Sequence, residues 1–188
     1  LSTMNHRFKA RFFQGDLGTD IRDKLGKHPF DSVSMQFAIH YMLKNKTTLE
    51  NMFNNVNDKL KKNGYFIFTA MDGQLVFNTL TQKSIQYKES YELKKDNEKI
   101  LGITRLYKEK TFEELGQEVS VFVSSIGDHA GEYLVNFDYV LGYFVKRGYQ
   151  LVASEYFKNI LDKNEQANDF AIKKMGDAEK EFSSLYRY

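Results

Sequence analysis

The sequence predicts an α/β fold in which a parallel sheet is interrupted by an antiparallel β segment. Two nearly continuous apolar runs, FDSVSMQFAIHY at Phe30–Tyr41 and YFIFTA at Tyr65–Ala70, are typical of strands buried inside a parallel sheet covered by helices on both faces. An amphipathic helical pattern separates the two runs. From residue 84 to 126 the pattern changes to alternation with polar turns, which indicates antiparallel strands.

The composition is that of a globular protein with a substantial core. The chain has 188 residues, of which 41% are hydrophobic and 15% aromatic, so we expect one domain. It has no cysteine, which excludes disulfides, thiolate zinc sites and cysteine nucleophiles and fits a reducing, intracellular setting. No apolar run is long enough to span a membrane. The net charge of +2 does not by itself indicate a nucleic-acid-binding protein. Lysines cluster at positions 59–62, 108–110 and 173–174, and such clusters are typical of solvated helix ends and turns.

The first elements are short. Phe8–Phe13 is a candidate strand, and Gln14–Gly18 is a turn with Asp16 exposed at its tip. Thr19–Lys27 carries apolar residues at helical spacing and is predicted to be a helix that ends before Pro29.

The helix between the two apolar runs has both its start and its end marked in the sequence. Thr47 and Glu50 have capping-box spacing, and Asn63–Gly64 is a typical helix end. One face is apolar, with hydrophobic residues at steps of four, three and four: Leu49, Phe53, Val56 and Leu60. After the second run, Gln74–Gln82 is predicted to be another helix.

The remainder of the chain is predicted to contain two or three antiparallel strands followed by a return to α/β structure. The candidate elements, in order, are strands at Ile85–Leu93, Ile100–Lys108 and Val119–Ser125, a helix at Glu132–Gly148, a strand at Tyr149–Phe157, a mostly helical stretch at Lys158–Glu181 and a final strand at Phe182–Tyr188.

Common catalytic motifs are absent from the sequence. The four histidines are scattered without metal-ligand spacing, and neither a G-x-S-x-G elbow nor a G-x-G-x-x-G loop occurs. Four polar residues, however, follow predicted strands: Asp16, Gln36, His40 and Tyr41. The carboxyl ends of parallel strands lie at one edge of the sheet, where ligands bind. Carboxylate and amide acceptors beside aromatic rings favour a nucleoside-like ligand, although each residue alone also suits a structural role, Asp16 in its turn and Tyr41 in packing.

The order of several motifs resembles the mRNA cap (guanine-N7) methyltransferases. FDSVSMQFAIHY, a helix and then LKKNGYFIFTAMDG follow one another, flanked by ARFFQGDLG upstream and by GEYLVNFDYVL and SSLYRY downstream. The TAMDG version is most similar to the methyltransferase domains of capping enzymes from large cytoplasmic DNA viruses. The resemblance implies a Rossmann-like, class I S-adenosylmethionine-dependent methyltransferase sheet, with residues 84–126 as an antiparallel insertion that contributes to the acceptor pocket.

The resemblance also implies roles for individual residues. Asp16 would hold the adenine amino group of S-adenosylmethionine, and Gln36 and Tyr41 would line the cofactor cleft. His40 and Tyr41 would lie between the cofactor and the cap guanine. The remaining guanine-binding residues would be Phe122, Glu132 and Tyr186. No residue would act as a general acid or base, because guanine N7 already carries a lone pair and only in-line alignment is needed.

The family's Gly-rich cofactor motif should precede Asp16 and is not in these residues, so we expect the chain to be the C-terminal part of one methyltransferase domain. The implied partners are the capped 5′ end of mRNA, the rest of a multidomain capping enzyme and a stimulatory subunit, with no membrane. The implied location is the host cytoplasm or a virion. Two alternatives remain: a class I methyltransferase acting on a small molecule, and a non-catalytic, methyltransferase-like stimulatory subunit.

Overall fold

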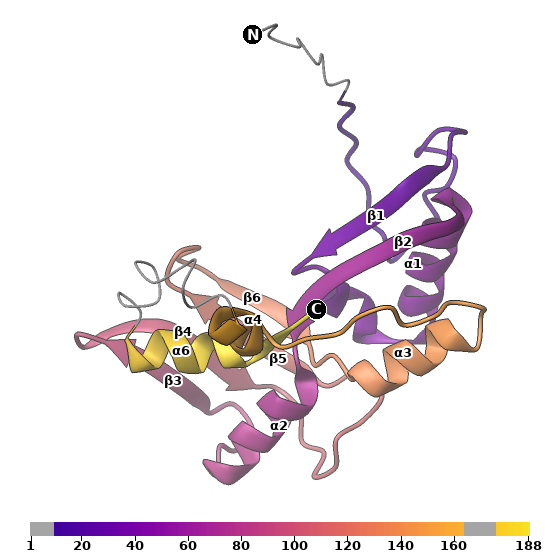
Figure 1. Ribbon diagram of the computed structural model, residues 1–188. Coiled ribbons are helices and arrows are strands. Elements are labelled where there is room, and N and C mark those ends of the chain that lie inside the picture. The colour runs from indigo at the N-terminus through magenta and orange to yellow at the C-terminus, as the bar shows by residue number, and fades with distance from the viewer. Residues whose placement is uncertain (1–9, 164–175) are drawn as a thin grey trace, which may run out of the picture.

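The computed structural model describes residues 10–163 and 176–188 and contains two sheets placed side by side (Figure 1). One is a mixed sheet with strand order β1-β2-β7, and the other is an antiparallel sheet with order β3-β4-β5-β6. The described elements are β1 Phe30–Gln36, the 3-10 helix η1 Ile39–Lys44, α1 Lys46–Lys59, β2 Leu60–Met71, α2 Gly73–Gln82, β3 Ser90–Lys95, β4 Glu98–Arg105, β5 Glu118–Val123, β6 His129–Tyr133, α3 Phe137–Val145, α4 Phe157–Lys163, α6 Asp177–Ser184 and β7 Tyr186–Arg187.

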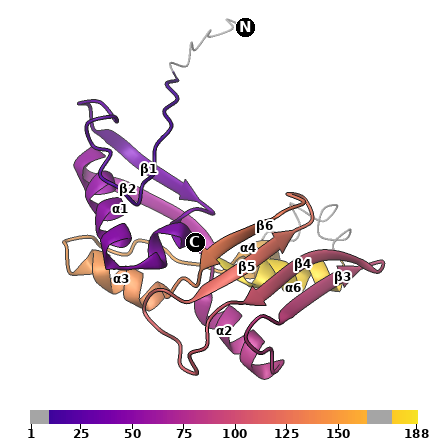
Figure 2. The same cartoon turned by 180° about the vertical axis from the view of Figure 1, so that it is seen from behind.

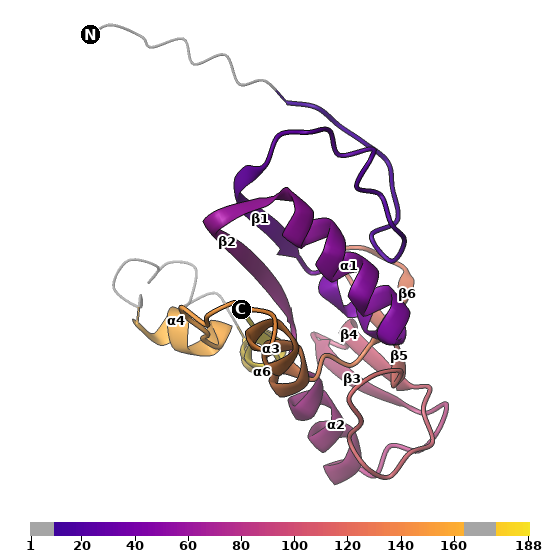
Figure 3. The ribbon, with the colours of Figure 1, turned by 90° about the vertical axis from the view of Figure 1, so that its right-hand side faces the viewer.

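Strands β1 and β2 are parallel and are joined by α1, as the two apolar runs predicted. Their inner face carries the pairs Val33↔Phe66 and Met35↔Phe68, which pack in a core with α1 and α3. Figure 3 shows α1 running alongside the two strands. The other face carries Tyr65 and Ile67, whose exposed fractions are 57% and 47%. The prediction of strands buried on both faces is therefore wrong within the described part of the chain: one face of this sheet is packed and the other is open.

Helix α1 starts and ends at different residues from those predicted. Its N-cap is Asn45, whose side chain accepts a hydrogen bond from the backbone of Thr48, while the Thr48 hydroxyl accepts one from Asn45 N–H. The helix stops at Lys59 because β2 begins at the next residue. Asn63, expected to end the helix, lies inside β2 with a φ of 63°. The apolar face is as predicted, with Leu49, Phe53 and Val56 buried.

The antiparallel sheet has four strands, where the sequence predicted two or three, and it continues to Tyr133, beyond the expected end at residue 126 (Figure 2). A second core lies between this sheet, α2 and α6, with Val76, Leu80, Leu101 and Ile103 fully or almost fully buried. The helix expected at Glu132–Gly148 is present only from Phe137, where Asn136 caps it, and Glu132 belongs to β6.

Several predicted elements at the two ends of the chain are absent from the described residues. Residues 10–13 form no strand, and 19–27 form turns in place of a helix. Tyr149–Phe157 is not a strand, and its only β pairing there is the bridge from Tyr156 to Arg187. The final strand is reduced to the two residues of β7, because α6 continues to Ser184. The middle of the stretch expected to be helical, residues 164–175, lies outside the described residues.

Candidate functional site

The candidate site lies where β1 ends and the chain passes into η1. Phe37 follows β1 with a φ of 49°, and its N–H donates to the backbone oxygen and the hydroxyl of Thr69 at 3.0 and 3.1 Å. A left-handed conformation is strained for a residue with a bulky side chain, and such residues cluster at functional sites. The turn ends the strand early, so His40 and Tyr41 lie on η1 and not on the strand itself.

His40 and Glu132 come together from different sheets. Strand β6 packs against η1, which places His40 Nδ1 3.6 Å from Glu132 Oε2. Both side chains are largely buried, with exposed fractions of 7% for His40 and 14% for Glu132. The ring of Tyr41 stands edge-on to the His40 ring, with the centroids 4.2 Å apart. An imidazole, a carboxyl and a phenol ring therefore share one partly enclosed site.

Burial determines the charge of this pair. It lowers the pKa of His40 to about 4 and raises the pKa of Glu132 to about 7. At neutral pH the imidazole is therefore uncharged, and the carboxyl is near its midpoint. His40 Nε2 is buried and finds no hydrogen-bond partner among the described residues. An unpartnered buried polar atom costs about 1–3 kcal/mol, so a ligand that supplies its partner gains that energy.

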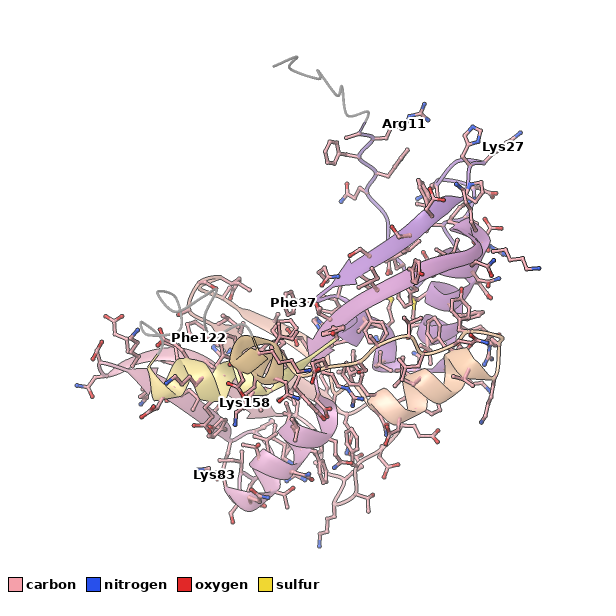
Figure 4. The ribbon with its side chains drawn as sticks, in the orientation of Figure 1. Arg11, Lys27, Phe37, Lys83, Phe122 and Lys158 are labelled. Atoms are coloured by element: carbon pink, nitrogen blue, oxygen red, sulfur yellow. The ribbon has the colours of Figure 1, made fainter. Side chains whose placement is uncertain are left out.

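Tyr186 completes the group from β7. The pKa of its hydroxyl is raised first by burial and then by the nearby Glu132 charge, which places the two residues together. The Tyr186 ring meets Phe37 edge-on at 5.4 Å between centroids and stacks on Phe157 at 5.9 Å. Phe37 is labelled in Figure 4. Sequence reasoning missed Phe37 and Phe157. Phe37 could have been identified from its place inside the QFAIHY motif, whereas no feature of the sequence marks Phe157.

Phe122 is not brought to this group. In the β5–β6 ladder Glu132 pairs with Val119, whereas Phe122 pairs with His129. Side chains alternate between the faces of a sheet, so Phe122 and Glu132 point to opposite faces. The ring of Phe122 instead meets Lys99 Nζ at 4.4 Å and the His129 ring at 5.2 Å.

Gln36 and Asp16 lie apart from the His40–Glu132 pair. Gln36 ends β1 and is exposed, with its Oε1 accepting from the Thr69 hydroxyl at 2.8 Å and its Nε2 donating to the Ser34 hydroxyl at 2.8 Å. Asp16 is also exposed, and its Oδ1 accepts from Gly18 N–H at 2.8 Å within the predicted turn. This turn rests on α1, because Asn51 Nδ2 donates to Gly18 O at 2.8 Å.

Asn55 fixes the segment that carries Asp16. This buried side chain accepts from Ile21 N–H at 3.0 Å and donates to Leu17 O and Thr19 O at 3.2 and 2.7 Å. Asn55→Leu leaves these backbone groups without partners, so we expect a loss of about 2 kcal/mol of local stability. Hydrogen exchange measures it as faster exchange at Ile21. The exposed neighbour Asn54→Leu is the control, and unchanged exchange at Ile21 in Asn55→Leu would contradict the assigned role.

The described part of the chain contains neither a metal-binding cluster nor a membrane-spanning helix. Within residues 10–163 and 176–188, no group of three or more histidine or acidic side chains is placed to hold a metal ion. Over the same residues, none of the helices combines the length and the hydropathy that crossing a bilayer requires.

Comparison with known proteins gives related sequences over nearly the whole chain. Residues 2–186 match the family model of the mRNA (guanine-N(7))-methyltransferase domain. The mRNA-capping enzyme of African swine fever virus (strain Badajoz 1971 Vero-adapted) is 30% identical over 163 residues, which are 86% of this chain and 19% of the viral protein. The probable mRNA-capping enzyme of Acanthamoeba polyphaga mimivirus is 31% identical over 138 residues, 71% of this chain and 12% of that protein.

A cellular protein is also similar. The mRNA cap guanine-N(7) methyltransferase of Cryptococcus neoformans (strain JEC21) is 24% identical over 158 residues, 80% of this chain and 24% of that protein. The chain thus spans between 12% and 24% of the length of these three relatives. Among solved structures, a S-adenosylmethionine-dependent methyltransferase from Clostridium acetobutylicum aligns over 78% of this chain and 56% of its own, with a TM-score of 0.45 and 14% identity.

Proposed function

The chain belongs to the mRNA (guanine-N7)-methyltransferase family, and on that premise we propose that His40, Tyr41, Glu132 and Tyr186 receive the guanine of a capped mRNA 5′ end. The observation that carries the proposal is the buried Glu132 carboxyl, which lies 3.6 Å from an uncharged imidazole and beside two phenol rings. A carboxylate in such a site is costly unless a ligand brings hydrogen-bond donors to it.

Guanine supplies those donors. Its N1–H and its N2 amino group lie side by side on one edge, and a carboxylate accepts both with its two oxygens. Its flat ring suits the aromatic surfaces of Tyr41 and Tyr186. The site therefore distinguishes guanine from adenine by donor pattern, because the corresponding adenine edge presents an acceptor at N1.

S-adenosylmethionine is the methyl donor in this proposal. Tyr41 is partly exposed on η1, and Gln36 and Asp16 present exposed polar groups that suit amino groups of the cofactor. Gln36 and Tyr41 flank the carboxyl end of β1, the usual ligand edge of a parallel sheet. When bound, S-adenosylmethionine supplies a methyl group activated by a sulfonium.

The residues of this chain orient the acceptor and leave proton transfer out of the reaction. His40, with a pKa of about 4, is uncharged at neutral pH. Guanine N7 carries a lone pair and no proton, so the reaction requires no base to deprotonate it. Methylation at N7 leaves the guanine ring positively charged, and an ionised Glu132 at its N1–N2 edge stabilises that charge. Alignment of N7 with the methyl group supplies the rest of the acceleration.

The test compares acceptors. Methyl transfer from radiolabelled S-adenosylmethionine is measured to capped RNA, to the same RNA with an uncapped triphosphate end, and to free nucleosides. Binding of fluorescent GpppA to the chain is measured separately, so that a missing cofactor site does not hide a working guanine pocket. We expect transfer only to the capped RNA, together with binding of GpppA. Transfer to free nucleosides instead favours a small-molecule methyltransferase, and GpppA binding no stronger than ApppA binding contradicts the guanine pocket.

We also propose that the chain works within a longer multidomain capping enzyme, because its match covers only 19% and 12% of the two viral capping enzymes. A stimulatory subunit stays a prediction from the family resemblance.

A further inference from the structure

Strand β7, which carries Tyr186, is too short to position a side chain by itself. It has only two residues, which pair with β2 at Ala70↔Arg187 and Met71↔Tyr186 and form a single further bridge, from Arg187 to Tyr156. Such a short ladder contributes few hydrogen bonds, and strands of two residues fray unless other contacts hold them. The position of the Tyr186 ring therefore depends on contacts outside this ladder, both those of the ring with Phe37 and Phe157 and those that hold its neighbours.

Arg187 provides such an anchor on the opposite face of β7. Its Nη1 lies 3.5 Å from Asp72 Oδ2, and its Nε donates to the Ser154 hydroxyl at 2.8 Å. The guanidinium also lies over the rings of Phe137 and Tyr156, 4.8 and 5.3 Å from their centroids. A planar guanidinium held by an ion pair, a hydrogen bond and two rings has little freedom to move.

Asp72 connects this anchor to the rest of the fold. Its Oδ1 caps α2 by accepting from the backbone of Gln74 and Leu75 at 3.0 and 3.2 Å, and its Oδ2 accepts from the Tyr156 hydroxyl at 3.0 Å. Its own N–H donates to Leu185 O at 2.7 Å. Asp72 thus joins the end of β2, the start of α2 and the start of β7. It keeps three side-chain hydrogen bonds when Arg187 is removed, so that change leaves the fold in place.

We propose that Arg187, held by Asp72, is a positioning residue that keeps the Tyr186 ring in place against Phe37 and Phe157 at the candidate site. Adjacent residues of a strand point to opposite faces, so an anchor at Arg187 fixes the orientation of Tyr186 without touching the substrate. The consequence for cap binding rests on the proposed function, whereas the consequence for the Tyr186 ring does not. Arg187 would thus affect the affinity for the acceptor through Tyr186, without contacting the acceptor itself.

The test uses the absence of tryptophan from the chain. In Tyr186→Trp the introduced indole reports its own environment through its emission maximum and its quenching by acrylamide. Adding Arg187→Ala to this variant is expected to shift the emission to longer wavelength and to raise the quenching constant. With Tyr186 intact, Arg187→Ala is expected to raise the KM for capped RNA about tenfold, with kcat within about twofold. Where the chain does not turn over alone, the Kd for GpppA replaces KM.

Two further variants serve as rescue and control. Arg187→Lys keeps a positive charge near Asp72 but loses the planar fork, so its KM and emission should be intermediate. Arg147→Ala removes a comparable anchor, whose guanidinium lies 3.4 Å from the Tyr143 ring centroid and donates to Tyr143 O at 3.1 Å. Arg147 follows α3, which ends at Val145, and within the described residues it contacts neither β7 nor its anchors, so the indole signal and the KM should stay unchanged.

Each outcome decides the inference. Unchanged emission and quenching in the Arg187→Ala background would overturn it, whatever happens to KM, because Arg187 would then act by another route. A changed emission with an unchanged KM supports the positioning role and shows that Tyr186 does not contact the cap, which removes Tyr186 from the proposed guanine pocket. A change in both supports the inference and the pocket together.

Discussion

Glu132→Gln is expected to lower kcat/KM for capped RNA by at least about a hundredfold, because a site built for hydrogen bonds loses its complementarity with the guanine edge. The carboxylate offers two acceptor oxygens, whereas the amide offers one acceptor and places an N–H against a guanine N–H. The change preserves shape and volume, so the pocket stays filled. The measurement is methyl transfer under multiple-turnover conditions, with S-adenosylmethionine binding measured in parallel and expected to be unchanged.

The matched control is Glu118→Gln on the adjacent strand. Glu118 pairs with Tyr133 in the β5–β6 ladder and so points away from the face of Glu132. The same chemical change at this position is expected to leave methyl transfer within about twofold of the original. Equal activity of Glu132→Gln and Glu118→Gln would remove Glu132 from the guanine pocket.

The free energy of unfolding of Glu132→Gln shows whether a loss of activity comes from the pocket or from unfolding. Burial raises the pKa of Glu132 from 4.5 to about 7. The folded state therefore favours the protonated carboxyl, and the stability this provides is present below pH 4.5 and is lost as pH rises through 7. Glu132→Gln avoids that loss, and we expect it to raise the free energy of unfolding at pH 8 by up to about 3 kcal/mol. An inactive variant that is more stable than the original cannot be explained by unfolding.

The sequence identified the central β-α-β unit because local patterns determine it. The apolar runs that became β1 and β2 and the spacing of Leu49, Phe53 and Val56 in α1 needed no knowledge of the tertiary structure. Prediction from the sequence was wrong where contacts between distant residues override a local pattern. The helical spacing that follows Glu132 extends back across that residue, yet the pairing of β6 with β5 makes it a strand. The predicted helix at 19–27 is absent, and Asn55 instead holds its start through Ile21 N–H.

The candidate site shows the same division. His40 and Tyr41 were identified from their motif, but the left-handed turn at Phe37 that moves them off the strand leaves no trace in residue type. Phe122 and Val121 differ by one position in β5, and only the register of the ladder decides which of them shares a face with Glu132. Arg187 gave no signal, because its partners Asp72 and Ser154 are distant in sequence.

The activity is also expected to fall steeply below neutral pH. In the proposed pocket guanine needs the ionised form of Glu132, and burial raises the pKa of this carboxyl to about 7. Below that value kcat/KM for capped RNA should fall about tenfold per pH unit, so that it is about a hundredfold lower at pH 5 than at pH 7 or above. The groups around Glu132 do not produce this change: burial lowers the pKa of His40 to about 4 and raises the pKa values of Tyr41 and Tyr186.

Proton release identifies the group that titrates. Guanine donors favour the charged carboxylate, so cap binding lowers the pKa of Glu132 and releases part of a proton at pH 7. Calorimetric titration with GpppA in two buffers of different ionisation enthalpy measures that fraction, which should reach about one proton near pH 6 and approach zero at pH 8.5. Asp72→Asn is unsuitable as a control because Asp72 holds β7, whereas Glu118→Gln should leave proton release unchanged. A kcat/KM that stays constant from pH 5 to 8 would contradict this prediction. It would mean that the carboxyl facing the guanine is ionised over the whole range, so that burial does not raise the pKa of Glu132 in the active enzyme.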